Sequence, residues 1–224
     1  NESVFVCGAN GLIPYFCAQI RGKLTSKKIY LIRHGQTDFN LKGIVQGSGI
    51  DSTLNETGVA QAFSFYEAYK DIHFDKVYTS VLKRSQQSVD SFIQKGINHE
   101  AHAGLNEINW GNKEGMRITP EEDDYYRWLL KQWQNNKTDL RIEGGESPED
   151  VAARQRPFLH KILERKEEQT ILICMHGRAI RVLLCQLLNY PLSAMDMFEH
   201  KNLGLYLLQY SGSMCKVDQY NNVD

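Results

Sequence analysis

Two short apolar segments, far apart in the chain, each lead into the dipeptide His-Gly. Residues 27–32 (KKIYLI) are separated by one arginine from the pair that begins at His34, and residues 170–175 (TILICM) run directly into the pair that begins at His176. Runs this short and this rich in β-forming residues are typical of buried strands followed by a tight turn. We therefore expect two buried strands whose ends each carry a histidine.

Helical patterns alternate with these strands. A third predicted strand, residues 76–79, also passes directly into a helix. Apolar strands that alternate with helices of more than ten residues are typical of an α/β domain with a largely parallel sheet, in which ligands bind beyond the carboxyl ends of the strands. Both His-Gly pairs fall at that edge. The predicted helices are 56–70, 81–94, 121–134, 148–165 and 178–188.

The charge balance limits the partners that the chain can attract. The 224 residues include 26 lysines and arginines and 27 aspartates and glutamates, so the formal net charge is -1. A chain near neutrality has no global field that draws it to nucleic acid or to an anionic membrane. We expect neither partner, and an anionic ligand has to be held by a local cluster of basic groups.

Cysteine usage and the N-terminal stretch bear on the compartment and the domain limits. The five cysteines show no C-x-x-C pair and no framework spacing, which fits a reduced compartment. Residues 4–20 are moderately apolar but are interrupted by glycine and proline, and no run reaches the roughly 18 apolar residues of a spanning helix. We interpret residues 1–26 as an N-terminal extension and 27–224 as one domain, and expect a cytoplasmic monomer or homodimer.

Arginines change the interpretation of the strand-end histidines. Arg33 beside His34 offers a bidentate fork for a phosphoryl group and disfavours protonation of the imidazole, and only the neutral imidazole is a nucleophile. Arg84 lies in the first turn of the helix predicted after strand 76–79, where a helix N-terminus also favours anions. Taken singly, each histidine could equally be a structural residue with no catalytic role, and Arg84 alone is most simply interpreted as part of a solvated helix face.

Glu107 is the candidate proton donor. It lies in a predicted loop, flanked by the apolar residues Leu105, Ile108 and Trp110. A partly desolvated carboxyl group can hold a proton near neutral pH and pass it to a leaving oxygen. Without the histidines and arginines, this stretch is only an acidic loop.

Other catalytic patterns are weak or absent. The sequence has no H-E-x-x-H, P-loop or G-x-S-x-G motif. His99 and His102 have no further partner at ligand spacing, so we expect no metal. The arginines after Cys174 do not have the spacing of a cysteine phosphatase loop, and we interpret Cys174 as an inert thiol buried in a strand.

Six sequence blocks, taken together, resemble the histidine phosphatase superfamily, the phosphoglycerate mutase-like group, over nearly all of residues 29–204. The resemblance implies a three-layer α/β/α fold with a largely parallel central sheet. Two positions depart from the usual pattern: Ser85 replaces an alanine after Arg84, and Arg178, which either contacts substrate or caps a helix, replaces a smaller or neutral residue. The blocks are Arg33-His34-Gly35-Gln36-Thr37-x-x-Asn40, Gln46-Gly47 with Leu54-Asn55-Glu56-x-Gly58, Thr79-Ser80-x-Leu82-x-Arg84, Leu105-x-Glu107-x-x-x-Gly111-x-x-Glu114-Gly115, Gly145-Glu146-Ser147 and His176-Gly177.

The same resemblance implies roles for the site residues. His34 is expected to become phosphorylated, and Glu107 is expected to protonate the leaving group. Arginines and the second histidine then surround the phosphoryl group, and no metal or other cofactor is expected. The residues expected to contact the substrate are Arg33, Asn40, Gln46, Gly47, Arg84 and His176.

The favoured function is therefore a phosphomonoester hydrolase of the histidine acid phosphatase type, acting through a phosphohistidine on a small phosphorylated metabolite. One alternative is a phosphoglycerate mutase-type phosphotransferase, and another is a non-catalytic phosphate-binding module. A pure binding site has no use for a nucleophile and a proton donor together, which disfavours the module. The segment between Gly115 and Gly144 is short and centred on the acidic run EEDDYY, whereas the mutases that the sequence resembles carry a longer, more basic insertion.

Overall fold

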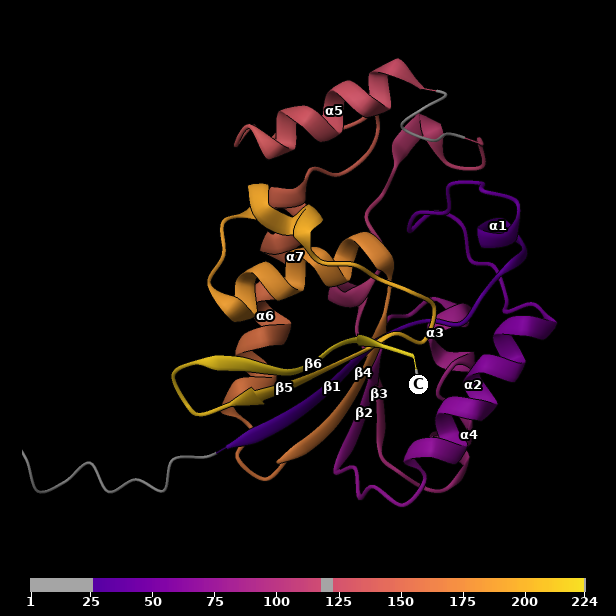
Figure 1. Cartoon of the computed structure of the whole chain (residues 1–224), viewed down its shortest axis with the longest axis vertical. Helices are drawn as coiled ribbons and strands as arrows, with labels where there is room; N and C mark the ends of the chain where they lie inside the picture. The colour runs from indigo at the N-terminus through magenta and orange to yellow at the C-terminus, as the bar shows by residue number, and fades with distance from the viewer. Residues whose placement is uncertain (1–25, 118–122, 224) are drawn as a thin grey trace, which may run out of the picture.

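A six-stranded sheet forms the centre of the computed structural model, which describes residues 26–117 and 123–223 (Figure 1). The strand order is β3-β2-β4-β1-β5-β6. Strands β1 to β4 run parallel, whereas β5 and β6 pair antiparallel and close one edge of the sheet. The strands are β1 (Lys27–Arg33), β2 (Lys76–Thr79), β3 (His99–Ala101), β4 (Thr170–Met175), β5 (Leu205–Tyr210) and β6 (Cys215–Asn222).

Helices cover both faces of this sheet. Figure 1 shows α6 and α7 on one face and α2 and α4 on the other. The helices are α1 (Asp38–Leu41), α2 (Glu56–Tyr69), α3 (Lys83–Gln87), α4 (Asp90–Gln94), α5 (Asp124–Gln134), α6 (Pro148–Glu164) and α7 (Gly177–Leu188).

Alternation along β1 explains the layers. Successive side chains of a strand point to opposite faces, so Ile29 and Leu31 join the core cluster that contains residues of α6 and α7. Tyr30 and Ile32 join a second cluster, which contains the buried aromatic residues of α2 and α4. Both faces of β1 are thus buried, as is typical of parallel strands. The predicted three-layer α/β/α class is confirmed.

Polar side chains start several helices. The hydroxyl of Ser147 and the carboxylate of Asp150 bond each other's backbone N–H in a capping box, and Pro148 occupies the first turn of α6. Asn55 caps α2 by accepting from the N–H of Gly58, and Asp123 caps α5. The helix predicted over 121–134 is accordingly observed from Asp124 onward.

One predicted helix is divided, and three strands were not predicted. The stretch predicted as a single helix over 81–94 forms α3 and α4, because the hydroxyl of Ser88 donates to the carbonyl of Arg84 and accepts from the N–H of Gly35, and Val89 leaves the helical conformation. Strand β3 is only three residues long, and β5 and β6 depend on pairing with the distant β1. Except for Ser26, the predicted extension 1–26 lies outside the described residues.

Register brings three strand ends to one level. Arg33 of β1 pairs with Met175 of β4, and Thr79 of β2 pairs with Cys174. The residues that follow these strands therefore meet at the carboxyl edge of the sheet, where the N–H of His34 donates to the carbonyl of Met175 at 3.0 Å. Within the described residues, no helix is long and apolar enough to span a membrane.

Candidate active site

A small pocket of about 150 Å³ lies at this edge of the sheet. Five of the residues that the sequence singled out line it, and these supply an imidazole, a guanidinium, a carboxylate and two amides. The rest of the lining is apolar or aromatic. The lining residues are Arg33, His34, Asn40, Gln46 and Glu107, together with Ile44, Val45, Trp110 and Tyr126.

His34 presents one ring nitrogen that has no hydrogen-bond partner within the described part of the chain. Its side chain is buried, and Nδ1 lies 2.7 Å from the carbonyl oxygen of Gly35. Because a carbonyl oxygen only accepts, this contact assigns the ring proton to Nδ1 and leaves the lone pair on Nε2. Burial lowers the pKa of His34 well below its ordinary value of 6.5, and Arg33 and Arg84 lower it further. The imidazole is therefore neutral at pH 7.

Arg33 is held by the loop that precedes β5. Its Nη1 donates to the carbonyl oxygen of His200 at 3.1 Å and lies 3.3 Å from Nδ1 of the same histidine. Its buried Nε has no hydrogen-bond partner among the described residues. Burial lowers the pKa of Arg33 to about 10, which the charge of Glu107 partly opposes, so the guanidinium remains cationic at neutral pH.

His176 lies beside His34 but is differently engaged. The two ring centroids are 5.1 Å apart. Nε of Arg84 donates to Nδ1 of His176 at 3.2 Å, so Nε2 of His176 carries the ring proton and donates it to Oγ of Ser80 at 2.7 Å. Burial, and then the charge of Arg84, lower the pKa of His176 well below 6.5. Both nitrogens of this neutral ring are therefore occupied.

Ser85 completes this hydrogen-bond chain. Oγ of Ser80 lies 2.7 Å from Oγ of Ser85, whose own hydroxyl reaches the carbonyl oxygen of Leu82 at 2.8 Å. Since His176 already donates to Ser80, the hydroxyl of Ser80 donates to Ser85, and Ser85 donates to Leu82. The serine that replaces the usual alanine is thus a member of the network behind His176.

Arg84 and Gly47 lie behind the pocket lining. Arg84 is fully buried, and its two terminal nitrogens donate to the carbonyl oxygens of Ile50 and Gly47, at 2.6 and 3.1 Å. Position 47 requires glycine because the backbone of Ile108 lies close to it: a Cβ at this position would lie 2.6 Å from the carbonyl oxygen of Ile108. The neighbouring Gln46 lines the pocket, whereas Gly47 positions Arg84.

Glu107 joins the pocket to the start of α7. Its Oε1 accepts from the N–H groups of Ile108 and Ala179, both at 2.9 Å, and its Oε2 accepts from the N–H of Arg178 at 3.1 Å. The N–H groups of Arg178 and Ala179 are otherwise unsatisfied donors of the first helical turn. A carboxylate has about four lone-pair sites. Three are used here, so one remains for a ligand.

The glycines of the two His-Gly pairs serve packing. The N–H of Gly35 is already used within the protein, because it donates to Oγ of Ser88 at 2.8 Å. A Cβ on Gly35 would lie 2.7 Å from the carbonyl oxygen of Gly58, and one on Gly177 would lie 2.9 Å from the ring of His200. A side chain at position 35 would displace the backbone at Gly58, and one at position 177 would displace the ring of His200.

Arg178 neither lines the pocket nor caps a helix. Its guanidinium carbon lies 5.9 Å from the ring centroid of Trp110 and 5.3 Å from that of Trp133. Its Nη1 is ion-paired with Asp196. The side chain therefore supports the aromatic part of the pocket from behind.

Several residues of the site carry no local sequence signal. Nδ2 of Asn202 donates to the carbonyl oxygen of His34 at 2.8 Å, and His200 binds Arg33. Ile44 and Val45 were not predicted either. These residues are brought to the pocket from separate segments, so no motif spacing reveals them.

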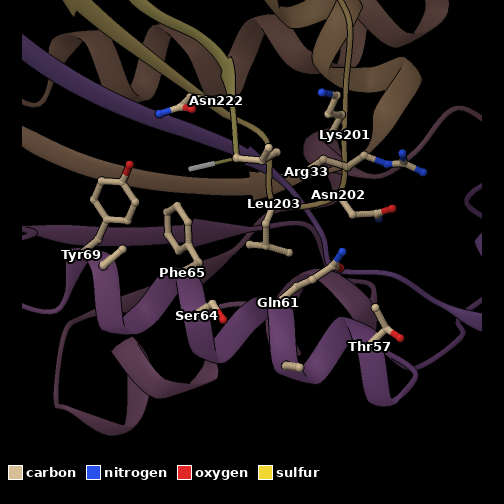
Figure 2. A pocket seen from close by; sticks show the side chains of 13 residues that line it. Arg33, Thr57, Gln61, Ser64, Phe65, Tyr69, Lys201, Asn202, Leu203 and Asn222 are labelled. Carbon is tan, nitrogen blue, oxygen red and sulfur yellow. The ribbon is translucent and has the colours of Figure 1, made fainter.

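A larger hollow beside the pocket lacks this chemistry. It measures about 700 Å³ and lies between α2 and the segment 201–203. Figure 2 shows Phe65 and Tyr69 on α2 facing Leu203, with the guanidinium of Arg33 pointing away from these rings. Among the described residues, no histidine or carboxylate lines this hollow. Within residues 26–117 and 123–223, no group of three or more His, Cys, Asp or Glu side chains is arranged to hold a metal ion.

The site thus combines a neutral strand-end histidine, a second buried histidine, arginines and a glutamate, as in a phosphate-handling enzyme of the α/β class. The family model of the histidine phosphatase superfamily (branch 1) matches residues 29–223. The chain belongs to this family.

Curated relatives include two 2,3-bisphosphoglycerate-dependent phosphoglycerate mutases. The one from Bartonella tribocorum is 32% identical over 169 residues, which cover 72% of this chain and 81% of the relative. The one from Bradyrhizobium diazoefficiens is 33% identical over 175 residues, with the same coverage.

Solved structures of similar fold include phosphatases. The alpha-ribazole phosphatase from Shigella flexneri has a TM-score of 0.76 and 23% identity, covering 88% of this chain and 96% of that one. A mycobacterial glucosyl-3-phosphoglycerate phosphatase has a TM-score of 0.75 and 23% identity, covering 88% and 99%. These likenesses concern the fold.

Proposed function

We propose that this protein is a phosphomonoester hydrolase that acts through a phosphohistidine at His34 on a small phosphorylated substrate. The observation that carries the proposal is the unengaged Nε2 of a neutral His34 in a pocket that also contains Arg33 and Glu107. A lone pair, a cation and a carboxyl group at one small pocket are the parts that phosphoryl transfer to a side chain requires.

In the first step, Nε2 of His34 attacks phosphorus while the bond from phosphorus to the alcohol oxygen breaks. Glu107, in its protonated form, gives its proton to the departing oxygen. Arg33, which lines the pocket, stabilises the negative charge on the phosphoryl oxygens, and the buried Arg84 behind the lining adds its positive field. The carbonyl of Gly35 holds the proton on Nδ1, so the ring accepts the phosphoryl group without changing its orientation.

In the second step, water attacks the phosphohistidine. The Glu107 carboxylate takes a proton from the water, the bond from phosphorus to Nε2 breaks, and inorganic phosphate leaves. His34 returns to its neutral state and Glu107 to its protonated state, so the cycle is balanced.

A phosphoglycerate mutase is the second candidate, and the two mutases with 32% and 33% identity favour it. A mutase has to retain a bisphosphate while it reorients, which calls for basic groups around the second phosphate and for exclusion of water. The acidic run between Gly115 and Gly144 supports hydrolysis instead.

The deciding experiment compares two rates on the purified full chain. We expect steady release of inorganic phosphate from p-nitrophenyl phosphate, and little interconversion of 2- and 3-phosphoglycerate with 2,3-bisphosphoglycerate present. If interconversion is much faster than phosphate release, the protein is a mutase and the proposed hydrolase function is wrong. Activity that disappears with a chelator and returns with zinc or magnesium would contradict the metal-free mechanism.

A further inference from the structure

The pocket lining has two chemically distinct parts. The polar part contains the proposed nucleophile, cation and proton donor. The other part is apolar and aromatic, and we call it the aromatic wall. It consists of Ile44, Val45, Trp110 and Tyr126.

The aromatic wall is firmly supported. The rings of Trp110 and Tyr126 meet edge to face, with centroids 5.5 Å apart and an interplanar angle of 73°. Trp110 also packs on Trp133 at 5.9 Å, and Arg178 lies over both tryptophans. These contacts fix the orientation of Trp110 before any ligand binds, so a ligand group that fits the wall binds a preorganised surface.

Ile44 and Val45 are also anchored. Val45 exchanges backbone hydrogen bonds with the 115–116 turn, from Gly115 N–H to its carbonyl and from its own N–H to the carbonyl of Met116. Ile44 forms an isolated bridge with Arg117. The apolar side chains are therefore a built part of the pocket.

Among the described lining residues of the pocket, one is a cation, and Arg84 lies behind them. Arg33 is the sole basic residue among the described lining residues. Two nearby cations have acidic partners: Lys113 with Asp123 at 2.7 Å, and Arg178 with Asp196. A second anionic group on a substrate would lose its hydration against the aromatic wall without gaining a partner.

We propose that the substrate is a phosphate monoester of an aromatic or apolar alcohol without a second anionic group, and that Tyr126 and Trp110 determine this specificity. The proposal rests on the hydrolase function proposed above. Phosphate binds the polar part of the pocket, and the alcohol portion packs on the aromatic wall. The volume of about 150 Å³ holds the phosphate with a small part of the alcohol.

The test uses a matched set of esters that all release primary alcohols. We expect kcat/KM for benzyl phosphate to exceed that for 4-carboxybenzyl phosphate and for 3-phosphoglycerate by about tenfold or more. The first pair differs by a single added anion, so leaving-group chemistry is held nearly constant. Equal or higher kcat/KM for 3-phosphoglycerate would overturn the proposal.

Two variants test the wall itself. Tyr126→Ala is expected to lower kcat/KM for benzyl phosphate about tenfold and to change that for 3-phosphoglycerate less than about twofold. Tyr125→Ala, the adjacent exposed residue of α5 that does not line the pocket, is the control and should change neither. Val45→Lys adds a cation and is expected to shift the preference toward 3-phosphoglycerate. Equal losses on all three esters in Tyr126→Ala would overturn the role of the wall.

Binding to His34→Ala separates this proposal from the hydrolase function. By calorimetry, the variant is expected to bind benzyl phosphate about tenfold or more tightly than 3-phosphoglycerate. If the wild type releases no phosphate from any ester, the hydrolase function fails, and this binding ratio still decides the ligand class. Tighter binding of 3-phosphoglycerate would overturn the ligand class even if the wild type hydrolyses esters.

Discussion

The ends of β1 and β4 carry the same dipeptide at the same level of the sheet, yet the two histidines have different hydrogen-bond partners. His34 uses one ring nitrogen, which bonds the carbonyl of the next residue. His176 uses both, which bond Arg84 and Ser80. Burial keeps both rings neutral, as the lowered pKa values of His34 and His176 indicate.

This difference indicates that the nitrogen available to react is the one that has no hydrogen-bond partner in the folded protein. Nε2 of His34 faces a pocket, so it can form a bond to phosphorus. The ring of His176 is fixed by Ser80, which follows β2, and by Arg84 of α3, so it serves as a neutral and immobile neighbour. We therefore infer that the first histidine reacts and the second positions, and the following predictions test that division.

The largest effect is expected for His34→Ala. Removal of the nucleophile should lower kcat by about 10⁴-fold or more, because no other group in the pocket has a free lone pair at this position. Brief incubation with a radiolabelled substrate should leave an acid-labile, base-stable label on the wild type and none on the variant. His160→Ala, an exposed histidine of α6, is the control. A fully active His34→Ala protein would refute the division.

A smaller effect is expected for His176→Asn. Loss of a preorganised neighbour of the transferring group should lower kcat by about 10²- to 10³-fold. The label on His34 should still form, only more slowly, and a quench-flow measurement would follow it. If the His176 variant never becomes labelled and the His34 variant does, then His176 is the nucleophile and His34 is the positioning residue.

The two rings, together with the partly buried His200, whose pKa is lowered to about 2, should make stability depend on pH. Their pKa values are lower in the folded protein than the 6.5 of the unfolded chain. Below pH 6.5 the unfolded state therefore binds more protons than the folded state. The free energy of unfolding should decrease as the pH is lowered, by up to about 1.4 kcal/mol per pH unit for each ring.

Urea titrations at several values between pH 7.5 and pH 5 measure this slope. The slope should be shallower in His34→Ala and in His176→Asn than in the wild type, and by a similar amount in each. An unchanged slope in either variant would show that its histidine is not held neutral by burial.

The smallest effect is expected for Ser85→Ala. The substitution removes the acceptor for the hydroxyl of Ser80, so Oγ of Ser80 is no longer held in the orientation in which it accepts the proton of His176. The loss of one buried hydrogen bond corresponds to about 1 kcal/mol, so kcat should fall several-fold with little change in KM. Ser64→Ala, at an exposed position of α2, is the control. A change in KM alone would show that Ser85 acts on substrate binding and not through His176.

The sequence alone determined the architecture and the positions of the chemistry. Strands β1, β2 and β4 could be predicted from local patterns, because the apolar, β-forming residues that favour each strand are adjacent in the sequence. The strand-end placement of His34 and His176 followed from them, as did Arg33. Glu107 and Arg84 were found from the residue types around them and from the resemblance to a family.

Tertiary structure alone decided which partner each of these groups has. Ser80 and His176 are 96 residues apart and Glu107 and Arg178 are 71 apart, so no local pattern can report their hydrogen bonds. The same holds for Arg178, whose place behind the aromatic wall depends on tryptophans and an aspartate from other segments. A residue's identity fixes which protons it can give or take, but the folded chain fixes which neighbour receives them, and that neighbour determines whether a histidine reacts or supports.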